Sequence, residues 1–201
     1  MTLDRAGWPF VAGLGAITLA SSVFVPSLAA LGAVLLVFTL NFFRDPERRA
    51  PEDPGLFLSP ADGRVIRPDG ARISIFMNVF DVHVCRTPVA GRVTSLVHEP
   101  GRFLAAMKHQ ASEQNERTAI VVQTPEGERV RFVLVAGLVA RRIVCRVAAG
   151  RSLAAGERVG IIRFCSRVDL DLPAGSMPAV GVGDRVIAGE SVVARRGSRP
   201  A

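Results

Sequence analysis

The chain has 201 residues and a formal net charge of +7, and 49% of its residues are hydrophobic. This length is enough for one domain with a sizeable core, with or without an appendage. The positive charge alone would suit a nucleic acid, but with no Tyr and one Trp for bases to stack on, we expect no nucleic-acid partner. Nearly all basic residues are dispersed arginines, so a membrane lipid surface with anionic headgroups is the simpler partner. A solvated basic face without a specific ligand is the alternative.

Near the N-terminus, an unbroken run of 38 residues carries no charge, which is too long for the core of a signal peptide. Pro26 divides this run into two segments, 8–25 and 27–43. Each segment would be about 25 Å long as a helix, slightly short of the ~30 Å hydrocarbon core of a bilayer. We predict that residues 1–44 form a membrane-anchoring helical hairpin. The alternative is a helix pair buried in the core of a soluble protein.

Arginines flank the predicted hairpin on both sides. Arg5 precedes it, and Arg44, Arg48 and Arg49 follow it. Because positive residues are enriched on the cytoplasmic side of membrane segments, both ends of the hairpin are predicted to face the cytoplasm. We therefore expect the rest of the chain at the cell membrane, on its cytoplasmic side.

Residues 45–57 are rich in proline and charge, cannot continue a helix, and are predicted to be a linker. Residues 58–201 are mostly short apolar runs of strand type, separated by turn residues. This pattern predicts a mostly β, compact, barrel-like domain with one helical excursion. The predicted strands are 72–77, 91–97, 118–123 and 129–135, with a hairpin turn at 125–128 and a short helix at 103–110.

Residues 182–193 alternate apolar side chains around two glycine turns and look similar to half of a lipoyl- or biotinyl-type β-barrel. This likeness suggests a carrier or adaptor module. Carriers attach their cofactor to a lysine, and the only lysine is Lys108, in the predicted helix. The same shortage disfavours a pyridoxal enzyme, which needs a lysine to hold its cofactor. A non-catalytic, membrane-tethered β-barrel adaptor remains as the alternative function.

The three cysteines, Cys85, Cys145 and Cys165, are widely spaced and odd in number. They form no Cys-x-x-Cys pair and have no histidine at a metal-binding spacing. This pattern fits a reducing compartment and argues against a disulfide framework and against a structural zinc site. We therefore expect no metal.

Three segments carry the chemistry, and each alone is weak evidence. They are Ser-Pro-Ala-Asp-Gly-Arg-Val at 59–65, Phe-Met-Asn-Val-Phe-Asp-Val-His-Val at 76–84, and Arg-Phe-Cys-Ser-Arg-Val-Asp-Leu at 163–170. Together and in this order they resemble the short-form phosphatidylserine decarboxylase proenzymes. The resemblance spans nearly the whole chain and includes the Phe-Arg-Asp-Pro-Glu-Arg exit of the hairpin at 43–48.

The resemblance implies a membrane-bound lyase that converts phosphatidylserine to phosphatidylethanolamine and CO2 with a covalent pyruvoyl cofactor. The zymogen would cleave itself between Cys165 and Ser166 into a β chain, residues 1–165, and an α chain, residues 166–201. Ser166 Oγ would attack the Cys165 carbonyl, and elimination followed by loss of ammonia would leave the pyruvoyl group at position 166. Its carbonyl would form a Schiff base with the substrate amine. The resemblance also allows a homodimer.

Self-cleavage needs a base, because a neutral serine hydroxyl is a poor nucleophile. By the resemblance, Asp62, His83 and Ser166 form the self-processing set, and His83 also serves in the decarboxylation. His83 lies two residues after Asp81, so both side chains would share one face of an extended strand. The glycine after Asp62 lets its carboxylate sit on a tight turn. Without the family motifs, Asp62 would be read as a turn former and His83 as a structural strand histidine.

The other two histidines carry less weight. His98 lies near a predicted strand end, where a surface role is expected, and His109 lies in the predicted helix and is expected to be exposed. Residues 111–117 resemble an Asn-Glu-Arg stretch of the family. We interpret them as a structural or substrate-proximal loop without a catalytic role.

The chain departs from the family pattern at two positions. The family usually has glycine before the processed serine, whereas Cys165 carries a Cβ that narrows the backbone angles and could slow processing. Its thiol also permits a shifted reaction, in which Cys165 attacks the Phe164 carbonyl and itself becomes the pyruvoyl group. Long-form enzymes have a further histidine where Arg86 stands, so the base assignment rests on His83 alone.

Overall fold

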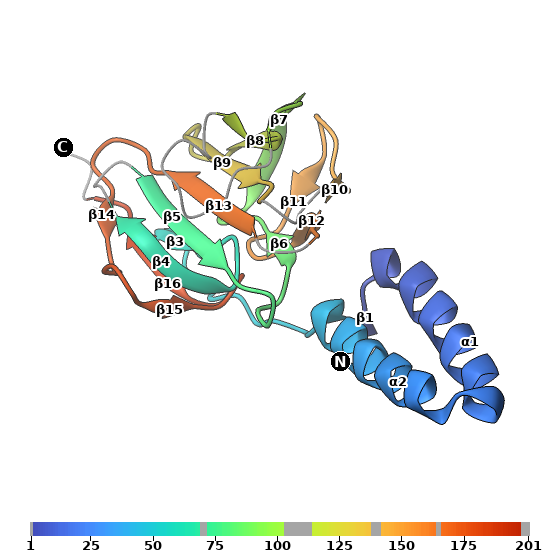
Figure 1. The fold of residues 1–201 in the computed structure, drawn as a ribbon. Coiled ribbons are helices and arrows are strands. Elements are labelled where there is room, and N and C mark those ends of the chain that lie inside the picture. Colours follow the sequence, from blue (N-terminus) through green and yellow to red (C-terminus); the bar gives the residue numbers. More distant parts are fainter. Residues whose placement is uncertain (1, 69–71, 103–113, 138–141, 164–165, 198–201) are drawn as a thin grey trace. The chain divides into compact units, whose positions relative to one another are not determined.

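The computed structural model describes residues 2–68, 72–102, 114–137, 142–163 and 166–197 (Figure 1). The chain forms two compact units, Met1–Glu47 and Arg48–Ala201. The predicted helix at 103–110 lies outside the described residues, as do Lys108, His109 and Cys165.

The first unit is a hairpin of two helices, α1 (Trp8–Phe24) and α2 (Pro26–Phe42), as the charge-free run predicted. Pro26 begins α2, where its missing N–H costs no hydrogen bond, and it forces the residue before it out of the helical conformation. The helices approach closely at Gly32, where an added Cβ would lie 2.4 Å from Thr18 Oγ1. Gly32 therefore permits a contact that a larger residue would block.

Most large apolar side chains of the hairpin are exposed, among them Leu19 at 75% and Phe24 at 84%. The stretch Arg5–Phe24, a 3-10 turn followed by α1, is long and apolar enough to cross a membrane, and α2 is shorter. A soluble protein rarely exposes so much contiguous apolar surface. Within the first unit, the hairpin leaves most of its apolar surface uncovered, and its insertion in a membrane stays a prediction.

A short antiparallel pair joins the two ends of the hairpin. β1 (Thr2–Leu3) pairs with β2 (Arg44–Asp45). Asp4 caps the following turn by accepting a hydrogen bond from the Ala6 N–H at 2.8 Å, and its own N–H donates to the Phe43 carbonyl at 2.8 Å. The hairpin is thus closed by backbone hydrogen bonds within the first unit.

The second unit is built around a curled, antiparallel eight-stranded sheet (Figure 1). In spatial order its strands are β11 (Ser152–Leu153), β7 (Gly91–Glu99), β8 (Arg117–Gln123), β9 (Arg129–Val135), β13 (Ser166–Asp171), β5 (Arg72–Met77), β4 (Gly63–Pro68) and β15 (Arg185–Val186).

Two small antiparallel sheets complete this unit. One contains β10 (Ile143–Cys145), β12 (Arg158–Ile162) and β6 (Val84–Arg86), in that order. The other contains β14 (Met177–Pro178), β16 (Val192–Arg195) and β3 (Leu56–Leu58).

The mostly β prediction for this unit is confirmed. The strands predicted at 72–77 and 129–135 match β5 and β9 residue for residue, and the strands predicted at 91–97 and 118–123 are longer by two residues and one. The hairpin turn predicted at 125–128 joins β8 to β9. The likeness of 182–193 to half of a lipoyl barrel stays a prediction, because this segment contributes β15 to the large sheet and part of β16 to a small one.

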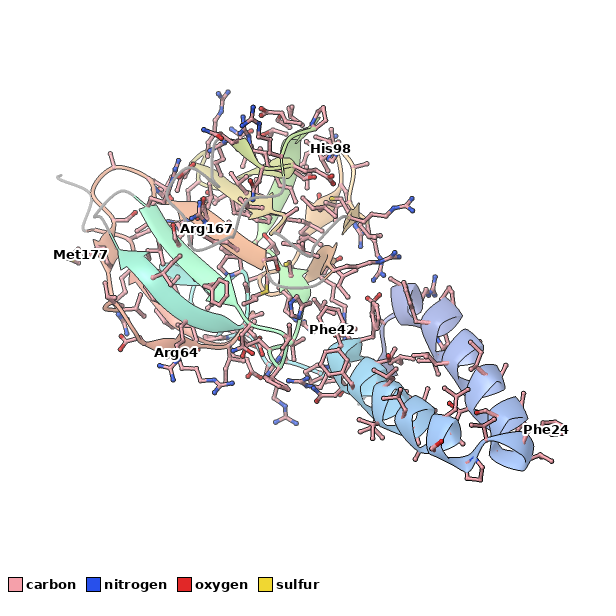
Figure 2. All side chains as sticks on the ribbon, in the orientation of Figure 1. Phe24, Phe42, Arg64, His98, Arg167 and Met177 are labelled. Carbon is pink, nitrogen blue, oxygen red and sulfur yellow. The ribbon has the colours of Figure 1, made fainter. Side chains whose placement is uncertain are left out.

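Strand β13 lies in the middle of the large sheet and is buried on both faces. Val168 and Leu170 pack in the main apolar core. Arg167 and Asp169 point to the other face, where Arg167 Nε lies 2.9 Å from Asp169 Oδ1 and the side chains are 4% and 3% exposed. Figure 2 labels Arg167 on this strand. Burying two charges is costly, so their pairing is required for the strand to occupy this place.

We predict that Asp169→Ala lowers the free energy of unfolding by about 3–5 kcal/mol, because it leaves the Arg167 charge buried without its carboxylate. The matched control is Asp171→Ala in the same strand. Asp171 binds Arg72 and Arg131 near the surface and is 26% exposed, so the expected loss is about 1 kcal/mol or less. Denaturant unfolding of the full chain in detergent, in a Ser166→Ala background, measures both. Equal losses would contradict the prediction.

Candidate active site

The register of three neighbouring strands brings Asp62 and Ser166 to the same end of the large sheet. Ser166, the first residue of β13, pairs with Met77, the last residue of β5. On the other side of β5, Gly63 begins β4, directly after Asp62. The backbones of Gly63 and Ser166 are therefore about 10 Å apart, because neighbouring strands are spaced by ~4.8 Å.

Gly63 is needed for this close approach. Its φ of +142° is a conformation that L-residues rarely adopt, and an added Cβ would lie 2.1 Å from the Phe76 carbonyl oxygen. The glycine after Asp62 therefore permits the close approach of this backbone to β5, and the role of Asp62 stays a prediction.

The backbone of His83, directly before β6, contacts the end of β12. Its carbonyl accepts a hydrogen bond from the Ile162 N–H at 3.3 Å, at the end of β12 and four residues before Ser166. The imidazole is fully buried, and Nδ1 lies 3.0 Å from the Asp81 carbonyl oxygen. A carbonyl only accepts hydrogen bonds, so in the neutral ring Nδ1 carries the proton and Nε2 carries the basic lone pair.

The expected relation between Asp81 and His83 is corrected by the structure. Both residues precede β6, which begins at Val84, so they do not lie in one extended strand. The Asp81 carboxylate accepts from the Asn78 N–H at 2.9 Å and pairs with Arg185 at 3.1 Å. It organises the turn before His83, and the contact to the imidazole comes from the Asp81 backbone.

The carboxylate of Asp62 is held from two sides. It accepts hydrogen bonds from Arg48 Nη2 at 2.9 and 3.2 Å and from the Ala188 N–H at 2.8 Å. Its negative charge also reaches the strand that follows His83. Burial raises the pKa of the Cys85 thiol, and the nearby Asp62 charge raises it further.

Two side-chain hydroxyls, those of Ser166 and Thr124, are buried without a hydrogen-bond partner within the described chain. Ser166 is fully buried. By contrast, the buried Ser59 hydroxyl donates to the Ala61 carbonyl at 2.6 Å. Leaving a hydroxyl buried and unsatisfied costs about 1–3 kcal/mol, so such groups are rare unless they have a function. Cys165, on the other side of the predicted cleavage point, lies outside the described residues.

The remaining candidates have structural contacts. His98, labelled on β7 in Figure 2, has Nδ1 3.0 Å from Thr118 Oγ1 on β8, and three strand steps separate β7 from β13. Arg86 is buried and donates to the Gly156 carbonyl at 3.0 Å. In the loop predicted at 111–117, Asn115 Nδ2 donates to the Ala136 carbonyl at 2.7 Å, which fits a structural role.

Sequence reasoning missed Arg48 and Glu190 as neighbours of this site. Arg48 was counted only as a flanking charge of the hairpin, yet it binds both Asp62 and Glu190. The signal that could have drawn attention to it is its place in the 43–48 exit segment, which was part of the family resemblance.

Known proteins resemble this chain over almost its full length. A family model described as phosphatidylserine decarboxylase matches residues 35–194. A phosphatidylserine decarboxylase proenzyme of Pelobacter propionicus is 45% identical, with 95% of each chain covered. Proenzymes with the same name from Syntrophus aciditrophicus and Burkholderia multivorans are 46% and 44% identical, covering 94% and 96% of this chain and 95% of each relative.

The Cys85 thiol gives a pH-dependent prediction. In the folded chain burial keeps it neutral, whereas in the unfolded chain it ionises near its ordinary pKa of 9.0. Its raised folded pKa means that the stability it contributes is present below pH 9 and is lost as pH rises above it. Above pH 9, the free energy of unfolding should fall more steeply than in Cys85→Ala, by about 1.4 kcal/mol per pH unit.

Denaturant unfolding between pH 8 and 10.5 measures these slopes, in a Ser166→Ala background that removes the candidate nucleophile. The cavity left by Cys85→Ala lowers stability at every pH, so only the difference in slope is diagnostic. Parallel curves would show that the thiol ionises in the folded chain and is not enclosed near Asp62.

Proposed function

This chain belongs to the phosphatidylserine decarboxylase family, and we infer that it converts phosphatidylserine to phosphatidylethanolamine and CO2 after cleaving itself at Ser166. The observation that carries the self-cleavage proposal is the buried Ser166 hydroxyl, which has no hydrogen-bond partner within the described chain. A hydroxyl kept free of hydrogen bonds and shielded from water is available to attack the carbonyl of the preceding residue.

In the proposed cleavage, Ser166 Oγ bonds to the carbonyl carbon of residue 165, and the C–N bond between the two residues breaks. The amide becomes an ester, and the nitrogen of Ser166 becomes a free amine. Loss of the Ser166 Cα proton then expels residue 165 as a carboxylate and leaves a dehydroalanine. Addition of water and release of ammonia convert the dehydroalanine to a pyruvoyl group at the start of the α chain, residues 166–201.

His83 is the proposed base for the attack. The Asp81 carbonyl fixes the ring with Nδ1 protonated, so Nε2 can accept the proton of the Ser166 hydroxyl. Complete burial excludes bulk water, which would compete for that proton. Asp62 is proposed to complete the set as an oriented carboxylate, and its place at the same end of the sheet supports this role.

The pyruvoyl group supplies an electron-accepting carbonyl next to the substrate amine, the task that a lysine-bound cofactor performs elsewhere. The first position of β13 would hold this group, because the strand stays paired with β5 and β9 after cleavage. His83 would hold the proton that replaces the departing carboxylate.

The substrate is a membrane lipid, so we propose that the apolar hairpin anchors the enzyme in the cell membrane with its catalytic unit on the cytoplasmic side.

Intact mass spectrometry tests the cleavage. We expect two chains, and the α chain should be lighter by one ammonia than the peptide that begins with Ser166. Ser166→Ala should remain one intact chain, because it has no hydroxyl to attack residue 165. Ser176→Ala, which changes the serine of the Gly-Ser pair at 175–176, is the matched control and should be cleaved like the wild type.

A wild-type chain that stays intact in lipid or detergent would overturn the self-cleavage proposal and favour the non-catalytic adaptor. An α chain beginning at Cys165 would move the chemistry to the neighbouring thiol.

A histidine variant tests the base. His83→Gln should slow cleavage by about 10²–10⁴-fold, because glutamine cannot accept the hydroxyl proton. His98→Gln is the matched control, since His98 binds Thr118 away from β13, and it should be cleaved at the wild-type rate. The fraction of cleaved chain against time after synthesis gives both rates. Cleavage of His83→Gln at the wild-type rate would rule out His83 as the base.

A further inference from the structure

Two segments of the catalytic unit, 48–49 and 188–190, bind the carboxylate of Asp62 directly or through Glu190. Arg48 Nη2 donates to both oxygens of Asp62, and Arg48 Nη1 lies 3.4 Å from Glu190 Oε2. The Glu190 carboxylate also accepts from the Arg49 N–H at 3.1 Å, and Asp62 accepts from the Ala188 N–H at 2.8 Å. Arg48 and Asp62 are both 13% exposed, so this ion pair is largely shielded from water.

The turn that carries Ala188 and Glu190 is fixed by its backbone as well. The Gly189 N–H donates to the Ser59 carbonyl at 2.8 Å, and the Ser59 N–H donates to the Ser191 carbonyl at 2.8 Å. Gly189 has a φ of +73°, and a Cβ there would lie 2.9 Å from Arg86 Cδ. The turn is therefore packed tightly against the segment that leads into Asp62.

This inference rests on the proposed cleavage, because the cut would place the contacting residues in two different chains. Arg48 and Asp62 belong to the proposed β chain, and Ala188 and Glu190 belong to the proposed α chain. After cleavage, each contact between these pairs joins two separate chains. A single guanidinium then bridges a carboxylate of one chain and a carboxylate of the other.

We propose that Arg48 is a positioning residue that fixes the Asp62 carboxylate for self-cleavage. Arg48 also binds the turn 187–191 of the α chain to the segment that carries Asp62. The planar guanidinium can bind two carboxylates in fixed directions, which the point charge of a lysine cannot. Both oxygens of Asp62 are thereby engaged, and its carboxylate acts as an oriented group. Arg48 follows the 43–47 exit of the hairpin, so the connector has a role in the site besides linking two units.

The test compares Arg48→Met with Arg49→Met in the full chain. Both variants remove one arginine from adjacent positions, but the Arg49 side chain is exposed and only its backbone N–H binds Glu190. Arg48→Met should slow cleavage by about 100-fold, the effect of a small displacement of a reacting group. Arg49→Met should be cleaved at the wild-type rate. Mass spectrometry at successive times after synthesis provides the rates.

Rescue distinguishes positioning from a merely structural role. In Arg48→Ala, added ethylguanidinium should restore part of the cleavage rate, whereas ethylammonium at the same ionic strength should not. Arg48→Lys keeps the positive charge but loses the planar guanidinium, so it should also be cleaved more slowly than the wild type. If Arg48→Met does not fold, Arg48→Lys decides the question, and cleavage at the wild-type rate would overturn the inference.

The two proposals fail in different ways. A wild-type chain that is never cleaved overturns self-cleavage at Ser166, and with it the role given to Arg48. A wild-type chain that is cleaved, with Arg48→Met equally fast, overturns only the positioning role. Loss of rate in Arg48→Ala that neither cation restores would also overturn it, because the arginine would then act through the fold alone.

Discussion

The pairing of β13 on both sides is the constraint on which the rest of the catalytic unit depends. Six of its residues are in register with β5 and five with β9, so the strand cannot move without breaking both ladders. Its alternation sets Val168 and Leu170 in the apolar core and directs the Arg167–Asp169 pair to the opposite face. Ser166 is fully buried and lies at the first position of this strand.

This placement suits a chain that is proposed to be cut immediately before β13. A strand at the edge of a sheet would fray once its covalent connection was lost, because only one neighbour would hold it. A central strand keeps hydrogen bonds on both sides, and the proposed α chain adds pairs of β15 with β4 and of β16 with β3. The new N-terminus would therefore stay where the chain was cut, which is where the reactive group is needed.

The side chains proposed to act on Ser166 come from separate segments of the chain. His83 is oriented by a backbone carbonyl, and Asp62 is oriented by Arg48 and a backbone N–H. Each is held by a group that does not itself take part in the proposed proton transfer. Such orientation matters because a catalytic group loses much of its effect when it is displaced by about 1 Å.

The sequence by itself determined the two helices, the strands at 72–77 and 129–135, and the family. Charge-free length, apolar alternation and short motifs are local properties, so each can be read from neighbouring residues. Only the tertiary structure decided the contacts of Arg48, because Glu190 lies 142 positions away and no local pattern relates them. Likewise, only packing decided that Arg167 and Asp169 are buried and that the Asp81 backbone orients His83. A polar residue in a strand has the same local signature whether water or another part of the fold covers it.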